Sequence, residues 1–184
     1  MIKIIPYLIL IAFLALLVCS VIYLSKRFAW SFGMDSATPL IIGFSAITLF
    51  FLAGSMPLIN STSSTGHFLY VMASILMGFY LFLLISVIIV HTVSIIIKIS
   101  PMVFGISSVV LALLVAVWGY WNSANIRITY LDIPMNGLEK EIKAVHLTDM
   151  HIGHFRRNGF LQNIIDKTNA HHADAIFLTG DYLD

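Results

Sequence analysis

Four long apolar runs fill most of the first 121 residues of this 184-residue chain. They cover residues 4–24, 39–59, 68–97 and 102–121. Each run contains at least the ~20 residues that a helix needs to cross roughly 30 Å of hydrocarbon. Because a small soluble domain cannot bury so many runs of this kind, we expect an α-helical membrane bundle of four transmembrane helices.

Charged side chains are nearly absent from this part of the chain. Those that precede Arg127 are Lys3, Lys26, Arg27, Asp35 and Lys98. Intramembrane charges usually mark transport paths or proton relays, so their scarcity disfavours a small transporter. His91 is the lone histidine within the runs, and without a nearby acid it is better explained as a hydrogen-bonded or interfacial residue than as a proton relay.

The first run is too long for a signal peptide, and no small-residue cleavage site follows it, so we expect it to be retained. Four crossings would place both chain ends on one face. The charges close to the spans slightly favour an extracytoplasmic position for the remainder of the chain. We therefore expect a multi-pass protein of the plasma (inner) membrane, in contact with membrane lipids.

The composition excludes several other classes of protein. Hydrophobic residues make up 59% of the chain, charged residues 10%, and the formal net charge is +1. No basic stretch interleaved with aromatic residues is present, so we do not expect nucleic-acid binding. The single cysteine, Cys19, lies in an apolar run, which excludes a disulfide framework and a thiolate metal cluster.

After a short linker at residues 122–125, the chain becomes polar and mixed, and residues 126–184 form a predicted second domain. Alternating apolar residues from Ile126 to Leu131, a turn at 134–137 and a further apolar run at 142–147 predict a β-hairpin at its start.

A strand–helix–strand unit is predicted next in the same domain. Residues 143–147 and 175–179 have the length and apolar content of buried strands. Between them, apolar residues recur at the spacing of one helical face and predict a helix over residues 158–169. Such a crossover places two parallel strands side by side, so we expect the start of a parallel α/β sheet.

Metal-ligand side chains follow both predicted strands. Asp149 and His151 come after the first strand, and Asp181 comes after the second. Neighbouring strands lie roughly 4.8 Å apart, so these carboxylates can share one cation or bridge two. Extended residues two apart point the same way, which would let Asp149 and His151 face one ion. The alternative is that Asp149 caps a turn and Asp181 begins a loop.

The motifs Asp149-x-His151 and Gly180-Asp181, in this strand context, resemble the first two blocks of the calcineurin-like metallophosphoesterase family. Residues 128–134 and 147–153 are more narrowly similar to its membrane-anchored bacterial branch, which resembles UDP-2,3-diacylglucosamine pyrophosphatases. The resemblance covers about the last third of the chain. It implies that Asp149 and His151 bind one metal ion and that Asp181 bridges two.

The resemblance also implies two divalent ions in the full-length enzyme, with manganese, iron or zinc suited to such oxygen and imidazole ligands. It implies hydrolysis of a phosphoester or pyrophosphate bond. The membrane anchor points to a lipid-linked phosphate or nucleotide, such as UDP-2,3-diacylglucosamine, as the substrate. Gly153 and Gly180 would let the backbone approach the site closely.

The later blocks of that family, Gly-Asn-His-Asp/Glu and Gly-His-x-His, are not found in this sequence. We therefore expect the amino-terminal part of a longer enzyme, with an α/β sandwich truncated at Asp184 and little or no activity alone. The alternative is a non-enzymatic membrane bundle, an interaction protein that carries a degenerate phosphoesterase module.

Several nearby polar residues stay outside the predicted ligand set. His154 and the pair Arg156-Arg157 could contact a substrate phosphate or belong to a solvated loop. His146 is expected to be a packed or interfacial residue rather than a metal ligand, and His171-His172 to form a surface turn.

Overall fold

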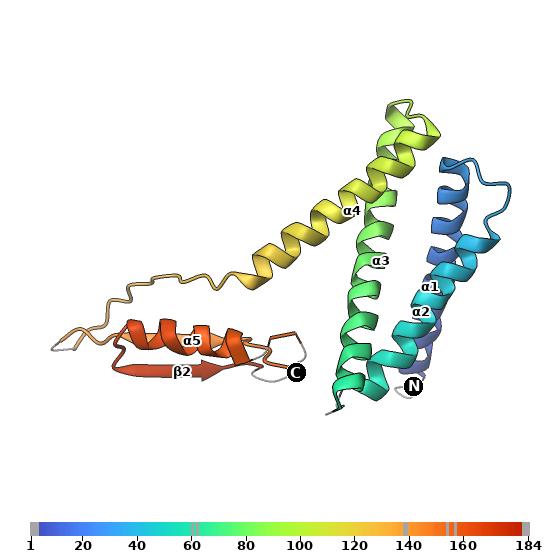
Figure 1. Cartoon of the computed structure of the whole chain (residues 1–184). Coiled ribbons are helices and arrows are strands. Elements are labelled where there is room, and N and C mark those ends of the chain that lie inside the picture. The colour runs from blue at the N-terminus through green and yellow to red at the C-terminus, as the bar shows by residue number, and fades with distance from the viewer. Residues whose placement is uncertain are drawn as a thin grey trace. The chain divides into compact units, whose positions relative to one another are not determined.

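The computed structural model describes residues 4–59, 61, 63–137, 140–153, 155–156 and 158–181. The chain divides into two compact units, Met1–Asn122 and Ser123–Asp184. Long helices dominate the first unit. They are α1 (Ile5–Ser31), α2 (Thr38–Leu58), α3 (Ser64–Ile96) and α4 (Pro101–Ala124), shown in Figure 1.

Each predicted apolar run forms a helix; α2 lies within one residue of its predicted bounds, whereas α1, α3 and α4 are longer than their runs. α1 continues past residue 24 to Ser31, because Lys26 and Arg27 end the apolar stretch without interrupting the helix. α3 begins at Ser64, where the Ser63 hydroxyl accepts a hydrogen bond from the Gly66 N–H at 3.0 Å and caps the first turn. α4 continues through Ala124, so residues 122–124 of the predicted linker are helical.

Three of these helices, α1, α3 and α4, are long and apolar enough to cross a membrane. The described apolar part of α2, Thr38–Gly54, is shorter. Pro39 stands in the first turn of α2, where its missing N–H costs nothing, as the sequence predicts. The prediction of membrane-crossing helices is thus supported for three helices by length and composition, and it stays a prediction for α2.

The interior of the first unit is small relative to its apolar surface. Leu24 and Val87 are fully buried, and the buried Tyr80 hydroxyl shares a hydrogen bond with Ser20. By contrast, Ile9 and Ile96 are 64% and 85% exposed. So much outward-facing apolar surface is unfavourable in water and favourable in lipid, which supports a membrane environment for these helices.

Small residues permit close helix contacts in this unit. A Cβ added at Gly54 of α2 would lie 3.2 Å from the Ala73 Cβ of α3. One added at Gly105 of α4 would lie 2.9 Å from the Ser31 Cβ of α1. The buried residues of α4 are Phe104, Gly105, Ser108 and Ala112. Within the described residues, α4 therefore packs through its first half, which is a looser arrangement than a bundle of four fully packed helices.

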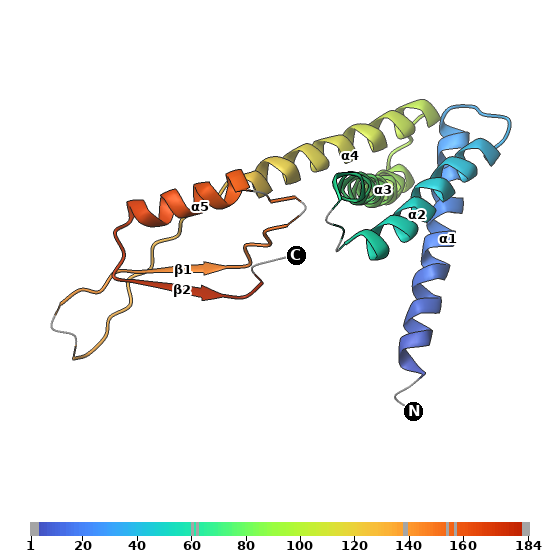
Figure 2. The same cartoon turned by 60° about the horizontal axis from the view of Figure 1, so that its bottom comes forward.

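The second unit contains β1 (Ala144–Thr148), α5 (Asn158–Ala170) and β2 (Ala175–Thr179). The strands are parallel, with Ala144 opposite Ala175 and Thr148 opposite Thr179. α5 lies over one face of this sheet, as Figure 2 shows. The predicted strand–helix–strand crossover is confirmed.

Asp174 fixes the register of the two strands. Its carboxylate accepts a hydrogen bond from the Lys143 N–H at 2.9 Å, and its own N–H donates to the Lys143 carbonyl oxygen at 2.8 Å. Because both strands then begin and end at the same level, the residues that follow Thr148 and Thr179 emerge together at one edge.

The predicted hairpin is wrong. Within the described residues, positions 126–135 form no strand, and β1 pairs with β2. The segment with the alternating apolar pattern therefore pairs with no strand among the described residues. Instead, the Lys167 ammonium of α5 donates to the Ile126 carbonyl oxygen at 3.4 Å, and the Tyr130 ring lies edge-on to His171. This segment therefore contacts α5 and the turn after it.

The strands are also less buried than their apolar content predicts. Ile176, Phe177 and Leu178 of β2 are 53%, 57% and 51% exposed. α5 buries Ile164 and Thr168, but among the described residues it is the one element that covers the sheet. Apolar residues show that a strand can be buried, but the helices and sheets packed against it determine how much of its surface is buried.

Candidate metal centre

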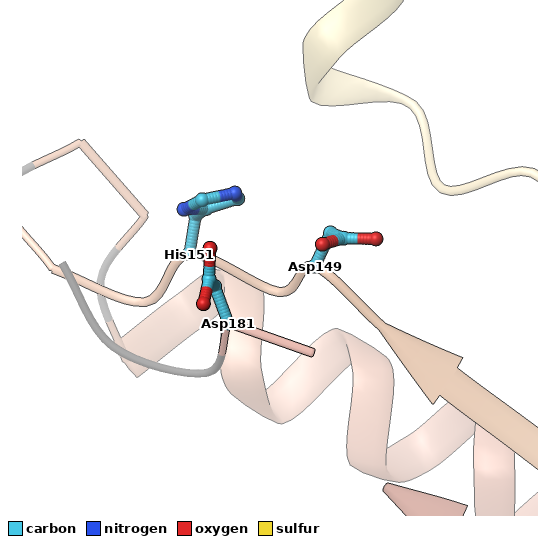
Figure 3. A group of neighbouring side chains, drawn as sticks. All are labelled: Asp149, His151 and Asp181. Carbon is cyan, nitrogen blue, oxygen red and sulfur yellow. The ribbon is translucent and has the colours of Figure 1, made fainter. Parts of the chain in front are cut away.

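The three predicted ligands lie together at the carboxyl end of the small sheet. Asp149 and His151 stand in the loop after β1, and Asp181 stands in the loop after β2, as Figure 3 shows. Each offers one ligand atom, and these atoms all lie within 4.8 Å of one another. In the part of the chain that the structure describes, no other group of three or more His, Cys, Asp or Glu side chains has this geometry.

The loop after β1 is not extended. The expectation that Asp149 and His151 point the same way because they alternate along an extended chain is therefore wrong. Both residues have positive φ, 51° and 46°, in the left-handed region. Such a conformation costs a non-glycine residue roughly 1–2 kcal/mol. The two side chains therefore reach a common point through a tight turn around Met150, and strand alternation has no part in it.

Backbone contacts hold this turn against the neighbouring loop. The His151 N–H donates to the Asp181 carbonyl oxygen at 3.2 Å and ties the two ligand loops together. The Gly153 N–H donates to the Arg156 carbonyl oxygen at 3.0 Å and closes the far side of the turn.

Gly180 is required where the two loops meet. Its φ is +87°, which side chains other than glycine rarely adopt. A Cβ there would lie 2.9 Å from the Thr148 hydroxyl oxygen and 3.1 Å from Asp149 Oδ1. The sequence expectation of close backbone approach at Gly180 is confirmed.

Two side chains orient the ligand loop. The Thr148 hydroxyl donates to Asp149 Oδ2 at 2.7 Å. Arg156 donates from Nη1 to the carbonyl oxygens of Met150 at 3.0 Å and Asp149 at 3.4 Å, while its guanidinium lies 4.9 Å from the Phe160 ring centroid. Arg156 therefore holds the backbone of the loop, a role that the amino-acid sequence did not reveal. The role of Thr148 could have been inferred from the sequence, because a hydroxyl residue directly precedes Asp149.

The donor set fits a divalent cation. Ligand atoms about 2.0–2.2 Å from an ion can be at most about 4.4 Å apart, so small rotations of these side chains would close the group around one ion. Asp149 and Asp181 are exposed and His151 is half-buried, which leaves access from solvent.

The other polar residues considered from the sequence fall outside this group. His146 is an exposed residue of β1, and its side chain hydrogen-bonds to the Thr179 hydroxyl. His171 contacts the Tyr130 ring in the turn after α5. His154, Arg157 and Asp184, like Lys3 at the other end, lie outside the described residues.

Comparison with known proteins gives partial similarities. No family model matches the chain, and no solved structure matches it. The chain is 34% identical over 76 residues to an uncharacterized metallophosphoesterase that is found in two strains of Helicobacter pylori. The aligned residues make up 40% of this chain and 20% of that protein. The chain is 35% identical over 54 residues to an uncharacterized metallophosphoesterase of Campylobacter jejuni, covering 29% and 14%.

The chain thus spans about a fifth of the length of the curated relatives it matches. Their names agree with the acid and imidazole side chains gathered after β1 and β2, which could hold a metal ion. These partial similarities support a relationship to the metallophosphoesterases, hydrolases that generally use divalent metal ions.

Proposed function

We propose that this chain is the membrane-held, metal-binding part of a phosphoesterase or pyrophosphatase. The observation that carries the proposal is the meeting of Asp149, His151 and Asp181 within 4.8 Å at the ends of two parallel strands. The uncharacterized metallophosphoesterases that match part of the chain support the same class of chemistry.

In this proposal Asp149 and His151 would hold a divalent ion, and the Asp181 carboxylate would provide a further ligand to the metal centre. The ions would supply electrostatic stabilisation of the charge that develops on phosphoryl oxygens during hydrolysis. The protein's part is positional. Thr148 fixes the rotamer of Asp149 through its hydroxyl, and Arg156 holds the carbonyl groups of the ligand loop.

We further propose that α2 crosses the membrane together with α1, α3 and α4, and that the second unit belongs to an α/β metallophosphoesterase sandwich. A domain that follows the last apolar helix directly in sequence is held at a membrane surface. Lipid-linked substrates are concentrated there, so we propose a lipid-linked phosphate or nucleotide, such as UDP-2,3-diacylglucosamine, as the substrate.

The test is hydrolysis by the natural full-length protein in detergent or nanodiscs. With Mn²⁺ present, it should cleave bis-p-nitrophenyl phosphate slowly and UDP-2,3-diacylglucosamine faster, and chelation should abolish both reactions. Asp181→Asn should lower kcat by about 100-fold, at the upper end of the effects seen for groups that support a metal. Asp132→Asn, which removes an exposed carboxylate outside the ligand group, should leave kcat unchanged.

Hydrolysis that survives both chelation and Asp181→Asn would contradict a metal-dependent mechanism at this site. If the folded protein hydrolyses none of these substrates, the alternative of an interaction protein with a degenerate module is favoured.

A further inference from the structure

A second cluster of polar side chains lies within the first unit. Arg27 of α1 donates from Nη2 to Nε2 of His91 on α3, and the Tyr23 hydroxyl lies 2.8 Å from His91 Nδ1. The Arg27 guanidinium carbon is 5.8 Å from the ring centroid of Tyr23 and 5.9 Å from those of Trp30 and Phe104. Three helices, α1, α3 and α4, thus fix one guanidinium.

Hydrogen-bond chemistry assigns the charge of this cluster. A guanidinium can only donate, so the His91 ring nitrogen that it contacts must accept the hydrogen bond. His91 is then neutral and gives no counter-charge. The cluster carries the full positive charge of Arg27, whose described hydrogen bonds run from Nη2 to the His91 ring.

No acid balances that charge among the described residues. Asp35 is the one acidic residue that precedes Arg127 in the sequence, and it forms no described ion pair with Arg27. Lys26 and Lys98 are exposed near the same end, where the α1–α2 and α3–α4 connections lie in Figure 1. This end of the helical unit is therefore positively charged.

The cluster lies at a defined depth along the helices. Arg27 stands one turn before the end of α1 at Ser31, and His91 stands five residues before the end of α3 at Ile96. At a rise of 1.5 Å per residue, both lie about 6–8 Å inside the helix ends. That distance is comparable to the headgroup layer, roughly 5–8 Å on each face of a bilayer.

We propose that Arg27, fixed by His91 and the three aromatic rings, binds the phosphate group of an anionic phospholipid at this end of the helices. Arginine is suited to phosphate because its planar fork offers paired donors. Basic pockets between helices are known sites for anionic headgroups. The inference rests on the membrane insertion included in the proposed function, but it does not depend on phosphoesterase activity.

The experiment uses Trp30 as a reporter in the full chain. Trp118→Phe and Trp121→Phe leave Trp30 as the single tryptophan. The protein is placed in phosphatidylcholine vesicles that contain phosphatidylglycerol, with either lipid brominated and with EDTA present. Brominated phosphatidylglycerol should quench Trp30 fluorescence at a mole fraction about fivefold lower than brominated phosphatidylcholine requires. This is the preference for an anionic lipid that is expected from roughly one arginine near the membrane surface.

Arg27→Gln should abolish this preference, whereas Arg27→Lys, which keeps the charge but loses the fork, should retain part of it. Lys98→Gln is the matched control, because it removes an exposed charge near the same end and should leave most of the preference. Circular dichroism checks that each variant folds, and Arg27→Lys provides the test if Arg27→Gln does not fold.

Equal losses in Arg27→Gln and Lys98→Gln would show diffuse surface charge and overturn the site. Loss of the preference on adding millimolar inorganic phosphate would assign the cluster to free phosphate and overturn the lipid. Absence of quenching by either lipid would overturn membrane insertion and this inference with it. A clear preference in a protein that hydrolyses no phosphoester would contradict the phosphoesterase proposal alone.

Discussion

At the scale of single residues, the ligand loops are held in a conformation that their sequence disfavours. Asp149 and His151 both adopt positive φ, and Gly180 fills the position where the loops touch. Left-handed non-glycine residues are stable when surrounding contacts over-determine them, and they are frequent at ligand sites. Here the contacts come from Thr148 and Arg156.

Gly180→Ala should therefore disturb the site. The new Cβ would meet Thr148 Oγ1 and Asp149 Oδ1, and a left-handed alanine adds about 1–2 kcal/mol of strain. We expect faster hydrogen exchange in β1 and β2 and weaker Mn²⁺ binding. Gly159→Ala is the control, because nothing lies within 4 Å of its added Cβ in α5. Unchanged exchange and binding in Gly180→Ala would contradict the role given to this contact.

Arg156→Gln tests whether this side chain positions the loop or contacts substrate. If it positions the loop, Mn²⁺ affinity should fall by about 10-fold, the lower end of the effects of outer-shell partners. The Mn²⁺ electron paramagnetic resonance spectrum should also change, and Arg156→Lys should rescue part of the loss. A raised KM with unchanged Mn²⁺ affinity would instead assign Arg156 to the substrate phosphate.

The meeting of Asp149, His151 and Asp181 could be predicted from sequence, but the backbone conformation that brings them together could not. Asp149, His151 and Asp181 were recognisable because each follows an apolar strand-length run. The left-handed turn was not, because aspartate and histidine are compatible with several backbone regions. The role of Arg156 depends on that turn, so it was hidden as well.

At the scale of elements, the close contact between α1 and α4 depends on Gly105. Its missing side chain admits the Ser31 Cβ and the Phe32 ring, which a new Cβ would meet at 2.9 and 3.0 Å. Gly105→Leu should lower the free energy of unfolding by about 1–3 kcal/mol, as overpacked cores do. Thermal unfolding in detergent, followed by helical circular dichroism, measures the change.

Gly119→Leu provides the matched control on the same helix, since no atom lies within 4 Å of a Cβ at Gly119. It should leave the unfolding temperature nearly unchanged. Equal destabilisation by both substitutions would show that helix α4 itself, and not its contact with α1, is sensitive to the change.

Helices and strands were predictable to different degrees. The long apolar runs determine the helices, since each has the length of a bilayer-spanning helix, although charges and caps moved their ends. The strand–helix–strand unit was also evident. The expected hairpin failed because alternation at residues 126–131 needs a partner strand, and pairing is decided by tertiary contacts that a local pattern does not contain.

At the scale of the whole molecule, the number of membrane crossings is the open prediction. α2 has 21 residues, which at 1.5 Å each span about 32 Å, close to the hydrocarbon thickness. In a Cys19→Ala background, we expect Met34→Cys and Thr65→Cys to be labelled from opposite faces of membrane vesicles by an impermeant maleimide. Labelling of both from one face would show that α2 does not cross.

The division into an apolar helical unit and a polar α/β unit was visible in the distribution of charge along the chain. The extent of packing was not. The exposed second half of α4 and the exposed strand β2 show that apolar content does not reveal which surfaces meet protein and which meet lipid or solvent.

The most direct measurement is a titration of the full chain with Mn²⁺, followed by electron paramagnetic resonance. We predict that the chain immobilises Mn²⁺ through Asp149, His151 and Asp181, and that Asp181→Asn weakens this binding by at least about 10-fold, while Asp132→Asn does not. Equal Mn²⁺ affinity in the unsubstituted chain and in Asp181→Asn would contradict the proposed metal centre.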